Sequence, residues 1–234
     1  MSKNLFIVGT GTDVGKTYVS ALIAKKFIEN LLSHGYFKPV ASGNIRFADG
    51  TLSVADVEFV RKFVSENAAN KFNNKSARFI NAYAYENAYS PHLSAQIEGN
   101  APTLKAIKDK FDELSKNCEF ISVEGAGGVI CPLRYDSQKI MLTDVIKFLN
   151  LSVIVVANSG LGAINSTVLT IRYLKDQNIN VKGIILNNYE PENLIHQNNA
   201  AMIEHLSGVK VLECVTHGAI KLDLSIENLI NLYE

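Results

Sequence analysis

Short apolar runs alternate along the chain with longer segments in which apolar residues recur every three or four positions. The runs predict buried strands, and the longer segments predict amphipathic helices. Strands are predicted at residues 5–8, 36–43 with a break at Pro39, 120–123, 152–157, 181–186 and 209–215. Helices are predicted at residues 16 to about 34, 56–64, from 90–92 onward, 103–116, 143–149, 162–177, 194–206 and 226–233. This alternation predicts an α/β fold, with a mostly parallel sheet and helices on both of its faces.

The segments between these elements are polar. Residues 44–53 are predicted to form a loop, and residues 67–76, which are rich in asparagine and lysine, a surface loop or a frayed helix. We find no internal repeat and no proline- or serine-rich linker in the sequence. Hydrophobic residues make up 47% of the chain, which is enough to build a substantial core. We therefore expect residues 1–234 to form a single domain.

Composition narrows the expected partners. The 23 basic residues balance the 23 acidic ones, so no overall field draws the protein onto nucleic acid or an anionic membrane. No apolar stretch approaches the about 18 residues that a membrane-spanning helix requires. The three cysteines are scattered, which argues against disulfides and structural zinc. We expect a cytoplasmic protein, without a nucleic acid or a membrane as partner.

The first predicted strand leads into residues 9–17, with the sequence Gly-Thr-Gly-Thr-Asp-Val-Gly-Lys-Thr, and a predicted helix follows. A glycine-containing loop of this kind directs backbone N–H groups and the positive end of the helix dipole toward one point, which favours an anion. Lys16 adds a cation for terminal phosphate oxygens, and the Thr17 hydroxyl is placed to bind Mg²⁺. The sequence therefore predicts a nucleotide site, which we call the phosphate loop.

Polar residues follow the ends of several predicted strands. They are Lys38, Glu124, Asn158 and Asn187. Ligands of parallel sheets bind outside the carboxyl ends of the strands, so these residues are candidates for the same site. Glycines at 125, 127 and 128 let the backbone approach a ligand closely.

Phosphoryl chemistry needs oxygen ligands for a divalent metal and cations for the group that is transferred. Thr17, Asp56 and Glu124 are the candidate Mg²⁺ ligands, with Asp49 as an alternative to Asp56. Two lysines, Lys16 and Lys38, would neutralise the charge that develops during transfer.

Five blocks of the sequence, in this order, resemble those of the dethiobiotin synthetase family. They are the phosphate loop, residues 38–43 (Lys-Pro-Val-Ala-Ser-Gly), 90–92 (Ser-Pro-His), 123–128 (Val-Glu-Gly-Ala-Gly-Gly) and 161–165 (Leu-Gly-Ala-Ile-Asn). The resemblance implies a P-loop NTPase-like fold and an ATP- and Mg²⁺-dependent ligase. Such a ligase forms the ureido ring of dethiobiotin from 7,8-diaminopelargonate and CO₂. In that family a substrate amine becomes a carbamate, which attacks the γ-phosphate, and the second amine displaces phosphate from the resulting anhydride.

The resemblance also implies roles for individual residues. Lys16 and Lys38 would stabilise the carbamate and phosphoryl oxygens, and Thr12 and Ser42 would contact the diamine. The nucleotide would be bound by the following residues: Asp13, Val14, Gly15, Lys16, Thr17, Glu124, Gly125, Ala126, Gly127, Asn187 and Asn188. The family is homodimeric, and the partner's Gly162, Ala163 and Asn165 would bind the substrate carboxylate at the interface. Residues 212–217 lack the family's proline-containing segment that contacts the base, so the sequence leaves the base preference open.

The main alternative is a partition- or division-site ATPase, a switch that dimerises on nucleotide and carries a deviant phosphate loop. Those proteins have a signature lysine at the position that Thr10 occupies here. A second alternative, the amide-forming cobyrinate synthetase group, needs a glutaminase domain for which this chain is too short. A pure binding module would not need Lys38 and Glu124 beside the phosphate loop.

Overall fold

The computed structural model describes residues 2–68, 71–72 and 76–234. Within them, seven strands form one parallel sheet, as the sequence predicts. In spatial order they are β11 (Val211–Thr216), β10 (Val181–Tyr189), β9 (Val153–Asn158), β1 (Lys3–Gly9), β6 (Phe120–Glu124), β2 (His34–Ala41) and β5 (Ala77–Ala84). Strand β1 lies at the centre, with β6 and β9 as its neighbours, so the phosphate loop leaves the middle of the sheet.

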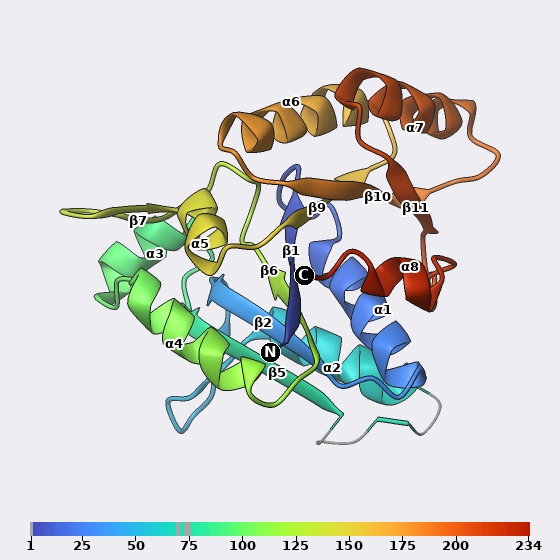
Figure 1. Ribbon diagram of the computed structural model, residues 1–234. Helices are drawn as coiled ribbons and strands as arrows, with labels where there is room; N and C mark the ends of the chain where they lie inside the picture. Colours follow the sequence, from blue (N-terminus) through green and yellow to red (C-terminus); the bar gives the residue numbers. More distant parts are fainter. Residues whose placement is uncertain (1, 69–70, 73–75) are drawn as a thin grey trace.

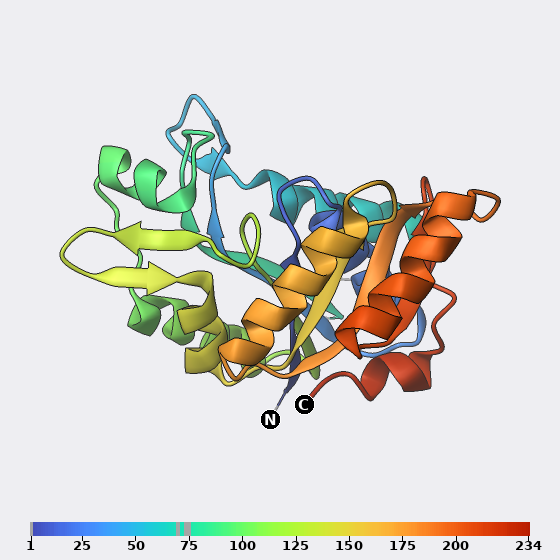
Figure 2. The ribbon, with the colours of Figure 1, turned by 90° about the horizontal axis from the view of Figure 1, so that it is seen from above.

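Helices cover both faces of the sheet (Figures 1 and 2). The apolar cluster on one face includes residues of α3 (Pro91–Glu98), α4 (Leu104–Ser115), α5 (Leu142–Leu149), α6 (Ala163–Asp176) and α7 (Leu194–Ser207). The clusters on the other face include residues of α1 (Lys16–Glu29), α2 (Ala55–Asn67) and α8 (Ile226–Ile230). Strand β1 shows why its sequence is apolar throughout: Phe6 and Val8 pack into the first cluster, while Leu5 and Ile7 pack into the second.

Two short antiparallel hairpins project from this core. The first pairs β3 (Ile45–Arg46) with β4 (Leu52–Ser53), and the second pairs β7 (Pro132–Tyr135) with β8 (Lys139–Met141). The first hairpin lies in residues 44–53, for which the sequence predicts only a loop. Part of the predicted surface segment 67–76 lies outside the described residues.

Two predicted boundaries on β2 are wrong. Helix α1 ends at Glu29, and His34 and Gly35 belong to β2 instead of ending the helix. The strand also continues through Pro39 to Ala41. Proline is tolerated there because the pairing of β2 with β6 already ends at Phe37, so the missing N–H group breaks no bond of that ladder.

Strand β5 is absent from the sequence-based prediction. It is the edge strand next to β2, and most of its residues are only partly buried. An edge strand of this kind needs no continuous apolar run, which is the signal that identified the interior strands. The helices are located more accurately: α4 begins after Thr103, whose side-chain oxygen accepts a hydrogen bond from the N–H of Ala106, as predicted for its N-cap.

No helix in the described part of the chain is long and apolar enough to cross a membrane.

Candidate active site

The phosphate loop connects the carboxyl end of β1 to the amino end of α1. Asp13 and Gly15 adopt positive φ angles of 59° and 93°, which turn the backbone into the helix. Gly15 cannot be replaced without strain, because a Cβ atom there would lie 1.9 Å from Nδ2 of Asn187. The Lys16 ammonium bends back over the loop and donates to the Gly11 carbonyl at 2.8 Å. The local geometry is therefore that of an anion-binding turn.

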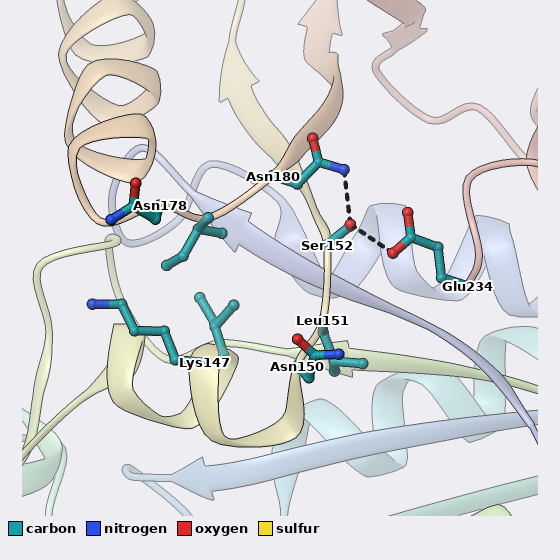
Figure 3. A pocket seen from close by; sticks show the side chains of 9 residues that line it. Lys147, Asn150, Leu151, Ser152, Asn178, Asn180 and Glu234 are labelled. Carbon is teal, nitrogen blue, oxygen red and sulfur yellow. Dashed lines mark hydrogen bonds between the residues drawn. The ribbon is translucent and has the colours of Figure 1, made fainter.

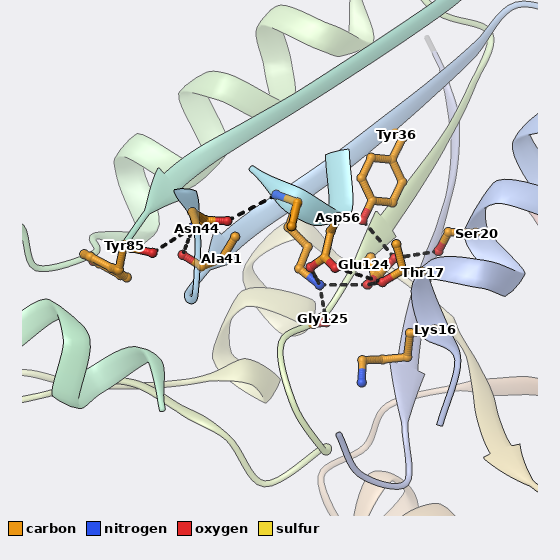
Figure 4. A network of polar contacts seen from close by, with 12 residues as sticks. Lys16, Thr17, Ser20, Tyr36, Ala41, Asn44, Asp56, Tyr85, Glu124 and Gly125 are labelled. Carbon is orange, nitrogen blue, oxygen red and sulfur yellow. Dashed lines mark hydrogen bonds and ion pairs between the residues drawn. The ribbon is translucent and has the colours of Figure 1, made fainter. Parts of the chain in front are cut away.

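Glu124, the last residue of β6, lies at the centre of a polar network (Figure 4). Its carboxylate is fully buried, and both of its oxygens accept hydrogen bonds. Oε1 accepts from the Thr17 hydroxyl at 2.8 Å and from the Lys38 ammonium at 2.7 Å. Oε2 accepts from the Ser20 hydroxyl at 2.8 Å and from the Tyr36 hydroxyl at 2.9 Å.

Asp56, from the first turn of α2, completes the network. Its Oδ2 lies 2.7 Å from the Lys38 ammonium, and its Oδ1 lies 3.1 Å from the Thr17 hydroxyl. The competing candidate, Asp49, is exposed and instead accepts hydrogen bonds from the backbone and side chain of Thr51. Of the two aspartates that the sequence left open, Asp56 is the one that reaches the site.

The pKa values of the two lysines are shifted in opposite directions. Burial alone would lower the pKa of Lys38, but the carboxylates of Glu124 and Asp56 raise it above the usual lysine value. Burial, and then the charge of Lys38, lower the pKa of Lys16. Burial raises the pKa of Asp56, yet the charge and hydrogen bond of Lys38, the Thr17 hydroxyl and the charge of Lys16 together hold that pKa below its usual value. Lys38 thus stays charged as the counter-ion of Glu124 and Asp56, whereas the Lys16 ammonium is hydrogen-bonded to the backbone of the phosphate loop.

A cavity of about 620 Å³ opens beside this network. Most of the residues that the sequence assigns to the site line it, namely Thr12, Asp13, Gly15, Lys16, Thr17, Lys38, Ser42, Asp56, Glu124, Ala126 and Gly127. Tyr18 and Phe59 also line it, and their rings lie 6.3 Å apart. The phosphate loop, the end of β2 and the start of α2 therefore surround one space.

Asn187 and Asn188 lie at the carboxyl end of β10, behind the loop. Asn187 is buried, and its Nδ2 donates to the Val14 carbonyl at 3.1 Å. Asn188 is exposed and its Nδ2 donates to the Asn158 side chain at 3.0 Å. The structure thus shows Asn187 bracing the phosphate loop, and its contact with a base stays a prediction.

The turn formed by Gly162, Ala163 and Asn165 begins α6, where Gly162 is the N-cap with a φ of 85°. Gly162 and Asn165 are exposed, and none of the three residues lines the cavity of its own chain. The buried Asn199 of α7 holds the preceding loop, because its Nδ2 donates to the carbonyls of Ser159 and Gly160, each at 2.8 Å. The turn is therefore well supported and accessible to another molecule.

Sequence reasoning missed Ser20 and Tyr36. Both are fully buried, and their hydroxyls point at Glu124 (Figure 4). Ser20 lies one helical turn after the phosphate loop, a spacing that places it on the face of α1 that carries Lys16 and Thr17. That spacing was a usable signal, whereas Tyr36 in an apolar strand was indistinguishable from a core residue.

The oxygens of this network fit a magnesium ion. In the described residues no group of three or more His, Cys, Asp or Glu side chains is placed to hold a metal. Two carboxylates and one hydroxyl do converge, however, and Mg²⁺ usually takes one or two protein carboxylates together with phosphate oxygens and waters. Thr17, Asp56 and Glu124 therefore suit Mg²⁺ in the presence of a nucleotide.

A second cavity, of about 300 Å³, lies beside the end of α5 and the amino ends of β9 and β10 (Figure 3). Three of its polar side chains are hydrogen-bonded to one another. Asn180 Nδ2 donates to the Ser152 hydroxyl, and that hydroxyl donates to Glu234, each bond being 3.0 Å long. These bonds join the start of β9 to the end of the chain. The cavity beside the phosphate loop is the better candidate for chemistry.

A family model described as an AAA domain matches residues 3–218. The ATP-dependent dethiobiotin synthetase BioD of Brachyspira hyodysenteriae is 43% identical over 235 residues, which cover 100% of both chains. The protein of the same description from Clostridium botulinum (strain Alaska E43 / Type E3) is 38% identical over 234 residues, covering 100% of this chain and 99% of that protein.

Solved structures resemble the fold at much lower identity. The septum site-determining protein MinD from Pyrococcus horikoshii OT3, complexed with Mg-ADP, aligns with a TM-score of 0.56 and 17% identity, covering 92% of this chain and 82% of that one. A ParA family ATPase from Chlorobium tepidum TLS aligns with a TM-score of 0.53 and 11% identity, covering 92% and 84%. At such identities the likeness concerns the fold alone.

Proposed function

The chain belongs to the family of ATP-dependent dethiobiotin synthetases, and we propose that its site closes the ureido ring of dethiobiotin from 7,8-diaminopelargonate and CO₂. The observation that carries this proposal is the meeting of Lys38, Glu124 and Thr17 beside the phosphate loop. A phosphate cradle alone would serve any nucleotide-binding protein. The buried lysine and carboxylate add what a phosphoryl transfer requires.

The roles of the residues follow from their positions. The phosphate loop, residues 9–17, would bind the triphosphate of ATP through its N–H groups and Lys16. Lys38 would hold the carbamate and the γ-phosphoryl oxygens together, because its ammonium lies at the cavity wall with its charge secured by two carboxylates. Thr17, Asp56 and Glu124 would hold Mg²⁺, which when bound neutralises charge on the phosphates.

Thr12 and Ser42 line the cavity, and we assign them to its substrate side. Both carry hydroxyls that suit the amines or the carbamate of the diamine. In the resulting reaction the carbamate oxygen bonds to the γ-phosphorus while ADP leaves. The second amine then bonds to the carbamate carbon while phosphate leaves.

We also propose that the protein acts as a homodimer in which each protomer binds the carboxylate of its partner's substrate. Gly162 and Asn165 begin a 14-residue helix and its first turn contains no acidic residue, so its N-terminus suits an anion. The turn does not line the cavity of its own chain, which is what a contribution to a partner's site requires. That residues 1–234 form one ligase domain, that the protein is cytoplasmic, and that it has no nucleic-acid or membrane partner stay predictions.

The test of the reaction is the dependence of ATP turnover on the diamine. The protein is mixed with Mg²⁺, ATP and bicarbonate, with and without 7,8-diaminopelargonate, and both ADP and dethiobiotin are measured. We expect ADP and dethiobiotin in equal amounts, and little ADP without the diamine. ATP hydrolysis that ignores the diamine would instead favour the division-site ATPase reading and reject the ligase.

The shared site has its own test in mixed dimers. Asn165→Asp places a negative charge beside the substrate carboxylate, so the KM for the diamine should rise at least tenfold with the KM for ATP unchanged. Refolding this variant together with an inactive Lys38→Met variant should restore activity, because one site of each mixed dimer is then intact. If the mixture is no more active than its components, the carboxylate is not bound by the partner.

A further inference from the structure

The two oxygens of the Glu124 carboxylate have different hydrogen-bond partners. We propose that Ser20 and Tyr36 hold its Oε2 so that only Oε1 is offered to the metal, and that this makes the site select Mg²⁺ over Ca²⁺. The inference rests on the proposed function in one respect, namely that Glu124 is a metal ligand. Neither hydroxyl touches the cavity, so both residues are positioning residues.

The geometry separates the two oxygens. Oε2 accepts from the Ser20 hydroxyl at 2.8 Å and from the Tyr36 hydroxyl at 2.9 Å. Both of these side chains are fully buried, as is Glu124. Oε1 instead faces the Thr17 hydroxyl and the Lys38 ammonium, both of which line the cavity. Each oxygen thus has one donor from α1 and one from β2, and Figure 4 shows Ser20, Tyr36 and Thr17 around the carboxylate.

The support behind Glu124 is rigid, because three elements contribute to it. Ser20 belongs to α1, Tyr36 to β2 and Glu124 to β6, and the backbones of β2 and β6 are paired at Tyr36 and Ser122. A carboxylate that swings toward a metal with both oxygens would have to leave two hydrogen bonds from hydroxyls that no water reaches. Breaking these hydrogen bonds makes bidentate binding of a metal less favourable, whereas binding through Oε1 alone leaves them intact.

This distinction bears on the choice of metal. Mg²⁺ demands near-ideal octahedral geometry and takes a carboxylate through one oxygen, whereas Ca²⁺ accepts six to eight oxygens and often binds a carboxylate through both. A carboxylate restricted to Oε1 therefore suits Mg²⁺ and denies Ca²⁺ one of its preferred ligands. Partners of ligating carboxylates commonly change metal affinity by about 10–100-fold.

The test compares metal binding without turnover. Wild-type protein, Tyr36→Phe, Ser20→Ala and the double variant are each loaded with ADP and Mn²⁺, and bound Mn²⁺ is followed by electron paramagnetic resonance. Mg²⁺ or Ca²⁺ is then added until half of the Mn²⁺ is displaced. Because Mn²⁺ uses the same ligand and its own affinity changes too, the readout is the ratio of the two displacing concentrations. For the double variant we expect the ratio of the Mg²⁺ concentration to the Ca²⁺ concentration to rise about tenfold.

Each single variant removes one hydroxyl and should shift the Mg²⁺-to-Ca²⁺ ratio by about threefold, so the singles carry the test if the double variant does not fold. Tyr233→Phe and Ser94→Ala are the matched controls. Each removes a buried hydroxyl that hydrogen-bonds elsewhere, Tyr233 to Ser122 and Ser94 to the Asn87 carbonyl. Both should keep the wild-type ratio.

The outcomes separate this inference from the function on which it rests. If Mg²⁺ and Ca²⁺ weaken equally in the double variant, the hydroxyls only satisfy a buried carboxylate and the inference is overturned. A change of the same size in the controls overturns it as well. If Glu124→Gln leaves Mn²⁺ binding unchanged, Glu124 is no ligand and the proposed metal site itself fails.

Discussion

Strand β6 (Phe120–Glu124) carries two buried polar clusters on the same face, one at its carboxyl end and one at its middle residue, Ser122. At its carboxyl end Glu124 is surrounded by Lys38, Thr17, Ser20 and Tyr36. Two residues earlier, the Ser122 hydroxyl lies 2.9 Å from Nε2 of His34 and 2.6 Å from the hydroxyl of Tyr233. Because side chains two residues apart in a strand share a face, one strand carries both clusters.

The two clusters differ in charge and in access. The cluster at Glu124 contains a charged pair and borders a cavity of about 620 Å³. The cluster at Ser122 is neutral, because burial lowers the pKa of His34 to about 3. Its imidazole stacks on Phe27 with the ring centroids 5.1 Å apart. The charged groups therefore lie beside the cavity, at Glu124, whereas the cluster at Ser122 consists of neutral hydrogen-bonded groups.

The largest effect is expected from removing the charge that balances Glu124. Lys38→Met keeps the length of the side chain but leaves a fully buried carboxylate without its ammonium partner. We expect turnover to fall by about a thousandfold or more, and stability to fall by about 3–5 kcal/mol, as for other broken buried pairs. Steady-state kinetics and urea unfolding measure the two effects.

A double variant separates the two roles of Lys38. Lys38→Met with Glu124→Gln removes both charges, so most of the lost stability should return while turnover stays lost. Lys25→Met is the control, since Lys25 is also buried but pairs with Glu29 outside the cavity. Near-normal turnover in Lys38→Met would mean that catalysis does not need the charge of Lys38, and the two clusters of β6 would then not differ in function.

A smaller, pH-dependent effect is expected at the neutral cluster around Ser122. The folded-state pKa of His34, about 3, lies below the usual value of 6.5, so the unfolded chain binds a proton between these pH values while the folded protein does not. The stability that neutral His34 provides is complete above about pH 6.5. It is lost at up to about 1.4 kcal/mol per pH unit as the pH falls toward 3.

The contribution of His34 can be isolated by difference. His34→Gln retains an amide that can meet Ser122 but does not titrate, so its stability should fall less steeply than that of the wild type between pH 6.5 and 4. Urea unfolding at several pH values gives both curves. Parallel curves would show that His34 takes up its proton equally in the folded and unfolded states, and the cluster at Ser122 would then not exclude the charged imidazole.

The difference between the two clusters was only partly visible in the sequence. Lys38, Thr17 and Glu124 could be placed together because the sequence predicts each at a strand end or a helix start, and parallel strands bring those points to one edge. For Lys38 the position is approximate, since β2 continues three residues further to Ala41. Asp56 could not be chosen over Asp49 in this way, because the choice depends on how α2 packs on α1 and not on local spacing.

Among the residues that the sequence missed, Ser20 has a helical spacing that could have identified it, whereas Tyr36 and His34 have no local signature. Tyr36 and His34 lie in one strand, and only the pairing of β2 with β6 shows that they face Glu124 and Ser122. Strand β5 was missed because an edge strand is only half-buried. Local patterns therefore located the elements and the ligand-binding edge, whereas contacts between distant strands required the structure.

The smallest effect is expected from Tyr233→Phe. The hydroxyl of this buried residue is hydrogen-bonded to Ser122, and the ring packs edge-on against Phe27 and Phe120, a packing that phenylalanine retains. We expect a loss of about 1 kcal/mol in the free energy of unfolding, with turnover and the Mg²⁺ requirement unchanged.

The equivalent change at the other cluster, Tyr36→Phe, removes a hydrogen bond from Glu124 itself. Since the two substitutions are chemically identical and both hydroxyls bond to β6, they differ only in which cluster loses the bond. A change in the Mg²⁺ requirement of Tyr233→Phe would show that β6 transmits the loss from Ser122 to Glu124, and the two clusters would then act as one unit.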